Sequence, residues 1–174
     1  MTLGGKSKFW IVVGALFAAL SVGLGAFGAH GLKGVIAGTF VSAEQDKVES
    51  TVDSNMVSDT ETEKALETDK DPETEEQFVN RRLENWNTGA RYQMYHALGL
   101  IFVGLLYVSG NRTLCKFAAI LFSIGIVLFS GMLYVLVLTN IKILGAIVPL
   151  GGLSFILGWL CFALAIGKGQ SNEQ

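Results

Sequence analysis

The chain has 174 residues, of which 51% are hydrophobic and only 16% are charged, and its formal net charge is −2. Soluble domains carry about 25% charged residues, so this composition excludes an ordinary water-soluble domain, and the lack of a basic patch gives no indication of nucleic-acid binding. Fourteen of the fifteen acidic residues lie between Glu44 and Glu84, which leaves the rest of the chain nearly uncharged. Apolar stretches of about 20 residues are typical of membrane spans, and the lipid bilayer is therefore the expected partner.

The first apolar stretch predicts a transmembrane helix over residues 9–28. It follows Lys6 and Lys8 but exceeds the apolar core of a signal peptide, about 7–15 residues, so we expect a retained helix. Small residues recur in it at four-residue spacing, which is typical of helices that pack closely in lipid. The glycine-rich end, with Gly25 and Gly28, lets the backbone turn and places His30 near the membrane interface.

The acidic segment 42–72 is rich in Glu, Asp, Ser and Thr and has no aromatic residue. It lacks the apolar surface to offset its ordering entropy, so we expect it to be disordered. Residues 73–86 predict a short interfacial helix, with Asp71 as N-cap, Pro72 at its first position and Trp86 as an aromatic anchor. Asn87, Thr88 and Gly89 are expected to end that helix.

Three further apolar stretches predict transmembrane helices over residues 92–108, 115–138 and 143–166. Pro149, Gly151 and Gly152 interrupt the last one, which membrane helices tolerate when neighbouring helices satisfy the freed backbone groups. Cys115 and Cys161 are expected to be apolar filler. The predicted fold is thus all-α: an integral membrane four-helix bundle with a long, largely disordered acidic loop between its first two helices.

Four spans place both termini on one side of the membrane. The first helix usually dominates orientation, and Lys6 and Lys8 before it outnumber Lys33 after it. We therefore expect a multi-pass protein of the cytoplasmic (inner) membrane with cytoplasmic termini and the acidic loop outside.

The same topology gathers polar residues in one half of the bundle. The end of the first span, the start of the second and the end of the third meet there, because neighbouring spans are antiparallel. A residue and the fourth one after it share a helix face, as Tyr92 and His96 do. The candidate buried polar cluster consists of His30, Tyr92, Gln93, His96, Ser130 and Tyr134, and the candidate helix-breaking and packing positions are Gly25, Gly28, Pro149, Gly151 and Gly152.

Four functions compete for this cluster. The first is an interhelical hydrogen-bond network that fixes the packing, which makes the protein a structural or accessory membrane component. The second is a pathway for a proton or small molecule lined by histidine and tyrosine. The third is a haem-binding electron-transfer subunit, although two histidines alone are an incomplete metal set. The fourth is an enzyme, for which no catalytic motif occurs at usable spacing; no catalytic residue, metal site or cofactor is predicted.

Four sequence blocks, one for each expected span, resemble the domain-of-unknown-function 423 family, also known through transmembrane protein 256. The resemblance implies a four-helix integral membrane protein, in bacteria usually of the cytoplasmic membrane, and it implies no established activity. Members of that family are shorter in the first loop, so the acidic insertion departs from the pattern. The blocks are Gly25-Ala-Phe-Gly-Ala-His30, Arg91-Tyr-Gln-Met-Tyr-His-Ala-Leu98, Leu128-Phe-Ser-Gly-Met-Leu-Tyr134 and Pro149-Leu-Gly-Gly-Leu-Ser-Phe155.

Overall fold

The computed structural model describes residues 4–39, 41 and 74–168, and the predicted acidic insertion 42–72 lies outside them. The described residues are helical apart from short turns, and they include no strand, which confirms the all-α class. The helices are α1 (Gly5–His30), α3 (Glu75–Leu106), α4 (Arg112–Gly125), the π-helical turn η1 (Ile126–Gly131), α5 (Met132–Thr139), the 3₁₀ turn η2 (Lys142–Ala146) and α6 (Val148–Gly167). Residues 32–39 and 41 are also helical.

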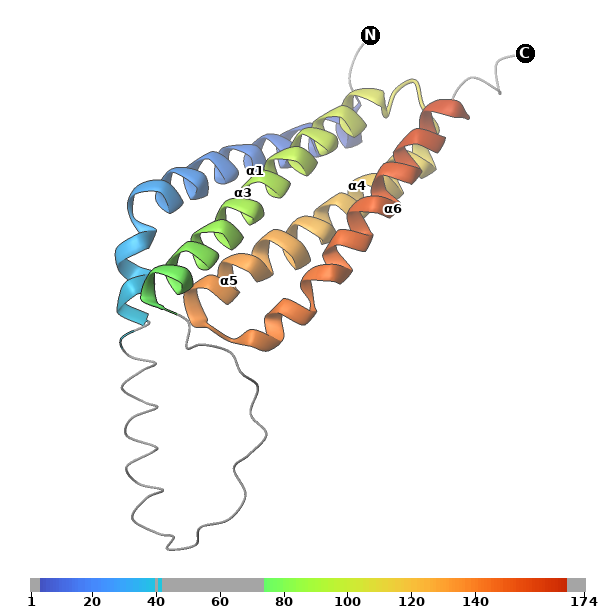
Figure 1. Ribbon diagram of the computed structural model, residues 1–174. Helices are drawn as coiled ribbons and strands as arrows, with labels where there is room; N and C mark the ends of the chain where they lie inside the picture. Colours follow the sequence, from blue (N-terminus) through green and yellow to red (C-terminus); the bar gives the residue numbers. More distant parts are fainter. Residues whose placement is uncertain (1–3, 40, 42–73, 169–174) are drawn as a thin grey trace, which may run out of the picture.

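The helices form two long pairs that lie side by side (Figure 1). α1 packs along α3, and α6 packs along α4 and η1. α3 also contacts α4, η1 and α5, so it joins the two pairs. The start of α1 and the end of α6 lie at the same end of the bundle, as an even number of passes requires.

Three helical stretches of the described chain are long and apolar enough to cross a membrane: Gly5–His30, Arg112–Thr139 and Lys142–Gly167. α3, which contains the predicted span 92–108, is not among them. Its apolar half adjoins Arg91, Gln93 and His96, and these side chains lower its hydropathy. Length and composition therefore support three spans. Whether α3 can be a fourth depends on where its polar side chains lie.

α3 corrects the prediction of a separate helix over residues 73–86. The helix starts at Glu75 with Thr74 as its N-cap, where Thr74 and Gln77 each bond the other's backbone N–H, and it continues without a break to Leu106. The predicted break at residues 87–89 is wrong. Trp86 and Ala90 are buried on either side of it, and such tertiary packing overrides the low helix propensity of Asn, Thr and Gly.

The last two predicted spans differ from the structure in local detail. The stretch predicted over 115–138 is α4, η1 and α5 in one continuous run that ends at Asn140, whose φ of 58° is left-handed. The stretch predicted over 143–166 begins as the 3₁₀ turn η2, and α6 follows from Val148. Pro149 stands in the first turn of α6, where a missing N–H costs nothing, so it begins a helix and does not interrupt one.

Two hydrophobic cores lie at different heights of the bundle. The larger one joins α3, α4, η1 and α6 around Leu100, Phe122 and Phe155. The smaller one lies at the end where α3 begins and joins Leu32 and Ile36 to Phe78 and Trp86 of α3. Of the polar residues predicted as a cluster, Tyr92, Gln93 and His96 lie on α3, Ser130 lies in η1, Tyr134 lies on α5, and His30 lies at the end of α1.

Candidate functional site

Gln93 of α3 is the polar side chain that links the two helix pairs. It is almost fully buried, with 2% of its surface exposed. Its Nε2 donates to the carbonyl oxygen of Phe17 in α1 at 2.9 Å, and its Oε1 accepts from the Tyr134 hydroxyl of α5 at 3.0 Å. One carboxamide thus uses both its donor and its acceptor to bridge three helices.

His96 lies one turn further along α3 and is sealed among aromatic rings. Its Nδ1 donates to the carbonyl oxygen of Tyr92 in the preceding turn at 2.7 Å. Its ring stacks on Phe155 of α6, with centroids 3.4 Å apart and an interplanar angle of 6°, and Phe122 and Trp159 lie against it too. The imidazole of α3 therefore packs between aromatic side chains of α4 and α6 and contacts them mainly through its ring face.

Tyr92 of α3 and Ser130 of the π-helical turn η1 lie near the same aromatic region. Tyr92 is 41% exposed and its ring packs on Phe129, with centroids 4.8 Å apart. Ser130, in the same turn as Phe129, is fully buried, and its hydroxyl is the one buried side-chain polar atom of the described residues that has no hydrogen-bond partner. Turns of π-helix occur frequently at functional sites.

His30 does not join the other predicted cluster residues. It is exposed at the last position of α1. Gly14 of α1 lies against the carbonyl of Ala97, so His96 is level with Gly14, and sixteen residues of helix, about 24 Å at 1.5 Å each, separate that level from His30. The two histidines are therefore too far apart to ligate one haem iron or metal ion.

The predicted glycine positions play unequal roles. A side chain at Gly28 would collide with the Trp86 indole, whose Nε1 bonds the Leu24 carbonyl at 2.7 Å. One at Gly151 would meet the backbone of Phe129 at 2.5 Å. Gly25 has open space around it, and at Gly152 the nearest atoms are the Phe129 ring at 3.9 Å. Gly28 and Gly151 are thus packing positions, and Gly25 and Gly152 are not.

The α1–α3 contact has a regularity that the sequence analysis missed. Its buried α1 residues are all small and recur every seven positions: Ser7, Gly14, Ser21 and Gly28. Ser7 donates to the Gly104 carbonyl, Gly14 lies against the Ala97 carbonyl, and Ser21 donates to the Ala90 carbonyl at 2.8 Å. Each step of seven residues up the sequence of α1 therefore matches a step of seven residues down the sequence of α3, as expected for two antiparallel helices. The four-residue spacing noted in the sequence does not form this interface, and a search at period seven would have found it.

Arg82 is a further buried polar residue, and it was not among the candidate residues predicted from the sequence. It is 3% exposed, its Nη1 donates to the carbonyl oxygen of Val137 in α5, and its guanidinium lies 4.4 Å from the Phe78 ring centroid. A buried cation of this kind is costly without such partners. The only signal in the sequence was its position four residues before Trp86 on the same helix face.

The described residues offer no group of three or more His, Cys, Asp or Glu side chains that could hold a metal ion. Cys115 and Cys161 are free thiols. The arrangement around Gln93 and His96 is chemically a set of interhelical hydrogen bonds and ring stacks, and it holds no nucleophile paired with a base.

Comparison with known proteins gives a consistent family result. The family model described as "Protein of unknown function (DUF423)" matches residues 65–152. The UPF0382 membrane protein YwdK of Bacillus subtilis is 38% identical over 163 residues, covering 92% of this chain and 98% of its own length. A UPF0382 membrane protein of Staphylococcus haemolyticus is 36% identical over 162 residues, covering 92% of this chain and 97% of its own length. No solved structure matches.

Proposed function

Because this chain belongs to the DUF423 family of proteins of unknown function, and like its relatives is a membrane protein, we propose that its helix bundle is a structural or accessory component of the membrane and that it is not an enzyme. The observation that carries this proposal is the use of the central polar groups in packing. Gln93 bonds α1 and α5, and Arg82 bonds α5. Interhelical bonds of this kind hold membrane bundles together.

The same observation supports α3 as the fourth span. Polar side chains are tolerated at membrane depth when they face the bundle interior and pair there, and Gln93 and His96 do both. The exposed side chains of the second half of α3 are mainly apolar, among them Leu98, Phe102 and Leu105. α3 therefore presents apolar groups to lipid and polar groups to its neighbours.

We base the proposed orientation in the cytoplasmic membrane on the first helix, because the two ends of the bundle carry equal numbers of described cations. The end that holds the start of α1 and the end of α6 carries Lys6, Lys8, Arg112, Lys116 and Lys168, and the other end carries Lys33, Arg81, Arg82, Arg91 and Lys142. The first helix usually dominates orientation, and Lys6 and Lys8 before its apolar stretch outnumber Lys33 after it. The end that holds the start of α1 therefore faces the cytoplasm, and the acidic loop lies outside.

A double-mutant cycle between Gln93 and Tyr134 tests the packing role. Gln93→Leu keeps the bulk of the side chain and removes both bonds, and Tyr134→Phe removes one of them. We expect Gln93→Leu to lower the free energy of unfolding by about 1–3 kcal/mol, and the pair to show a coupling of about 0.6–1.7 kcal/mol, measured by denaturant titration in micelles. Tyr95→Phe, an exposed tyrosine on the same helix, is the neutral control. No loss of stability in Gln93→Leu would overturn the packing role.

One observation favours the alternative of a proton or small-molecule pathway. Ser130 is buried without a partner in the π-helical turn, beside Phe129, which packs on Tyr92. If the protein forms such a pathway, proteoliposomes that contain the wild type carry a proton or solute flux above that of empty vesicles. The variant His96→Leu should then abolish that flux. We expect no such flux; its detection would replace the structural function with the pathway.

A further inference from the structure

The end of the bundle that holds the start of α1 has a pocket outside the site described above. It has a volume of about 410 Å³ and is lined by Gly4, Gly5, Lys6, Ser7, Tyr107, Val108 and Arg112. Three chain segments contribute: the first turn of α1, the end of α3 and the first residue of α4. None of the lining residues belongs to the Gln93 and His96 arrangement.

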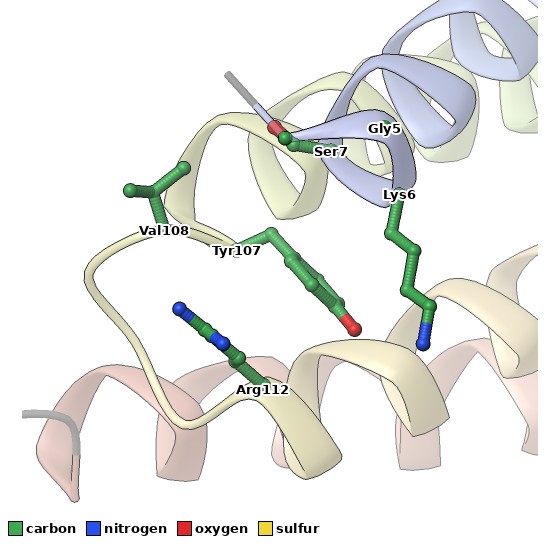
Figure 2. Close-up of a pocket in the computed structure, with 7 residues that line it drawn as sticks. Gly5, Lys6, Ser7, Tyr107, Val108 and Arg112 are labelled. Carbon is green, nitrogen blue, oxygen red and sulfur yellow. The ribbon is translucent and has the colours of Figure 1, made fainter. Parts of the chain in front are cut away.

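A cation stands on each side of this pocket. Figure 2 shows Lys6 from α1 on one side of the Tyr107 ring and Arg112 from α4 on the other, with the Tyr107 hydroxyl on the Lys6 side. Lys6 and Arg112 are exposed, and neither forms an ion pair within the described residues. Within the described part of the chain, the pocket thus offers two positive charges without an acidic partner and a hydroxyl donor.

The surroundings of the pocket strengthen its positive potential. Lys8, Lys116 and Lys168 lie at the same end, and the described part of that end contains no Asp or Glu. The first turn of α1 has no side-chain cap, so its free N–H groups add partial positive charge beside Lys6. The Asn111 backbone N–H bonds the Ala165 carbonyl at 3.1 Å, which fixes the α3–α4 turn against the end of α6. This bond holds in place the turn that carries Val108 and leads into Arg112.

The level of the pocket relative to the membrane indicates which ligands can reach it. α1 becomes apolar from Phe9, and α4 becomes apolar after Lys116, from Phe117. Lys6 and Arg112 therefore lie where the hydrocarbon region gives way to headgroups. Tyrosine is enriched at this level, and basic pockets between helices on the cytoplasmic side are a known way of binding anionic headgroups. Arginine and lysine are both well suited to phosphate.

We propose that this pocket binds a phosphate group, carried by an anionic phospholipid headgroup of the adjoining leaflet or by free phosphate. Lys6 and Arg112 supply the charge, Tyr107 supplies a neutral donor, and the small residues Gly4 and Gly5 leave room for the phosphate to approach the backbone. The inference does not rest on the structural function proposed above, because it uses no residue of that site.

Binding to the full-length protein in micelles tests the proposal. The probes are short-chain phosphatidylglycerol, short-chain phosphatidylcholine and inorganic phosphate at matched ionic strength, read by calorimetric titration. We expect wild type to bind phosphatidylglycerol more tightly than phosphatidylcholine. The double variant Lys6→Gln with Arg112→Gln should weaken that binding by roughly 30-fold, from about fivefold for each basic residue near the surface.

The matched control is the double variant Lys8→Gln with Lys168→Gln, which removes the same charge from the same end but does not touch the pocket. It should lose less than about threefold, because exposed charges outside the site are screened. Melting temperatures in the absence of ligand establish that both variants fold. Competition by inorganic phosphate would identify phosphate itself as the recognised ligand, whereas binding of phosphatidylglycerol without such competition would assign it to lipid; either result supports the pocket. Equal binding of the two lipids together with no binding of inorganic phosphate, or an equal loss in the control variant, would overturn it.

Discussion

The α1–α3 contact and the α4–α6 contact both depend on small residues, but they use them in opposite ways. In the first, Gly14 and Ser21 lie directly against backbone carbonyls of α3. In the second, Gly158 of α6 makes room for the ring of Phe122, and Gly125 of α4 makes room for the ring of Phe155. At these positions the first contact brings two backbones together, and the second fits aromatic rings into notches. Each pair has one exception: Gly28 of α1 makes room for the Trp86 ring, and Gly151 of α6 lies against the backbone of Phe129.

The two contacts should respond differently when a larger side chain replaces a small one. A backbone carbonyl in a helix cannot move without disturbing its neighbours, whereas a ring can turn or shift by a few tenths of an ångström. Since no hydrophobic effect drives helices together in lipid, close packing and hydrogen bonds must supply the stability of both contacts. The backbone-to-backbone contact should therefore be the less tolerant one.

The largest effect is expected from Gly14→Ala. The new Cβ would lie 2.7 Å from the Ala97 carbonyl oxygen, so α1 must move away from α3, and we expect a loss of about 2–3 kcal/mol in the free energy of unfolding, measured by denaturant titration in micelles. Gly23→Ala, which has open space around it, is the control and should lose nothing. Equal stability of the two variants would contradict the claim that the α1–α3 contact depends on close backbone approach at Gly14.

A smaller effect is expected from Gly158→Ala. Its Cβ would lie 2.7 Å from two atoms of the Phe122 ring, which can rotate in part, so we expect a loss of about 1 kcal/mol in the same measurement. Gly152→Ala on the same helix is the control, because its nearest neighbours are 3.9 Å away. If Gly158→Ala cost as much as Gly14→Ala, the two contacts would be equally rigid and the distinction would fail.

The smallest effect is expected from Ser21→Ala. This change keeps the Cβ and removes only the hydrogen bond to the Ala90 carbonyl of α3, so we expect a loss of about 0.6 kcal/mol. Ser123→Ala is the matched control, because the Ser123 hydroxyl bonds the Ala119 carbonyl of its own helix at 2.9 Å. A loss in Ser21→Ala no larger than that in the control would mean that close approach alone, without hydrogen bonds, sustains the α1–α3 contact.

Sequence patterns predicted the all-α membrane class and three of the long apolar helices, because hydropathy over about 20 residues reports the solvent that a helix faces. They failed for α3, where Asn87, Thr88 and Gly89 look like a break and Trp86 and Ala90 hold the helix together. That outcome depends on partners distant in the chain, which a local pattern does not contain. The family resemblance named the right family.

The predicted polar residues illustrate the same limit. Topology placed Gln93 and Tyr134 at one depth, and the structure joins them by a hydrogen bond. It placed His30 there as well, but the register of α1 on α3 is set by Ser7, Gly14 and Ser21 and leaves His30 at the end of α1, about 24 Å from the level of His96. Arg82 lies in the segment 73–86, which was predicted as a separate interfacial helix, and only the packed structure reveals its bond to Val137.

The length of α3 has a consequence for how the protein responds to temperature. Thirty-two residues extend about 48 Å, whereas the hydrocarbon region is about 30 Å thick. With α3 as the proposed fourth span, its first turns and the small core around Leu32, Ile36 and Phe78 are therefore expected in water. That core alone is held by the aqueous hydrophobic effect, which weakens on cooling. Chilling the protein should therefore loosen the water-side end first, while the part inside the bilayer keeps its packing.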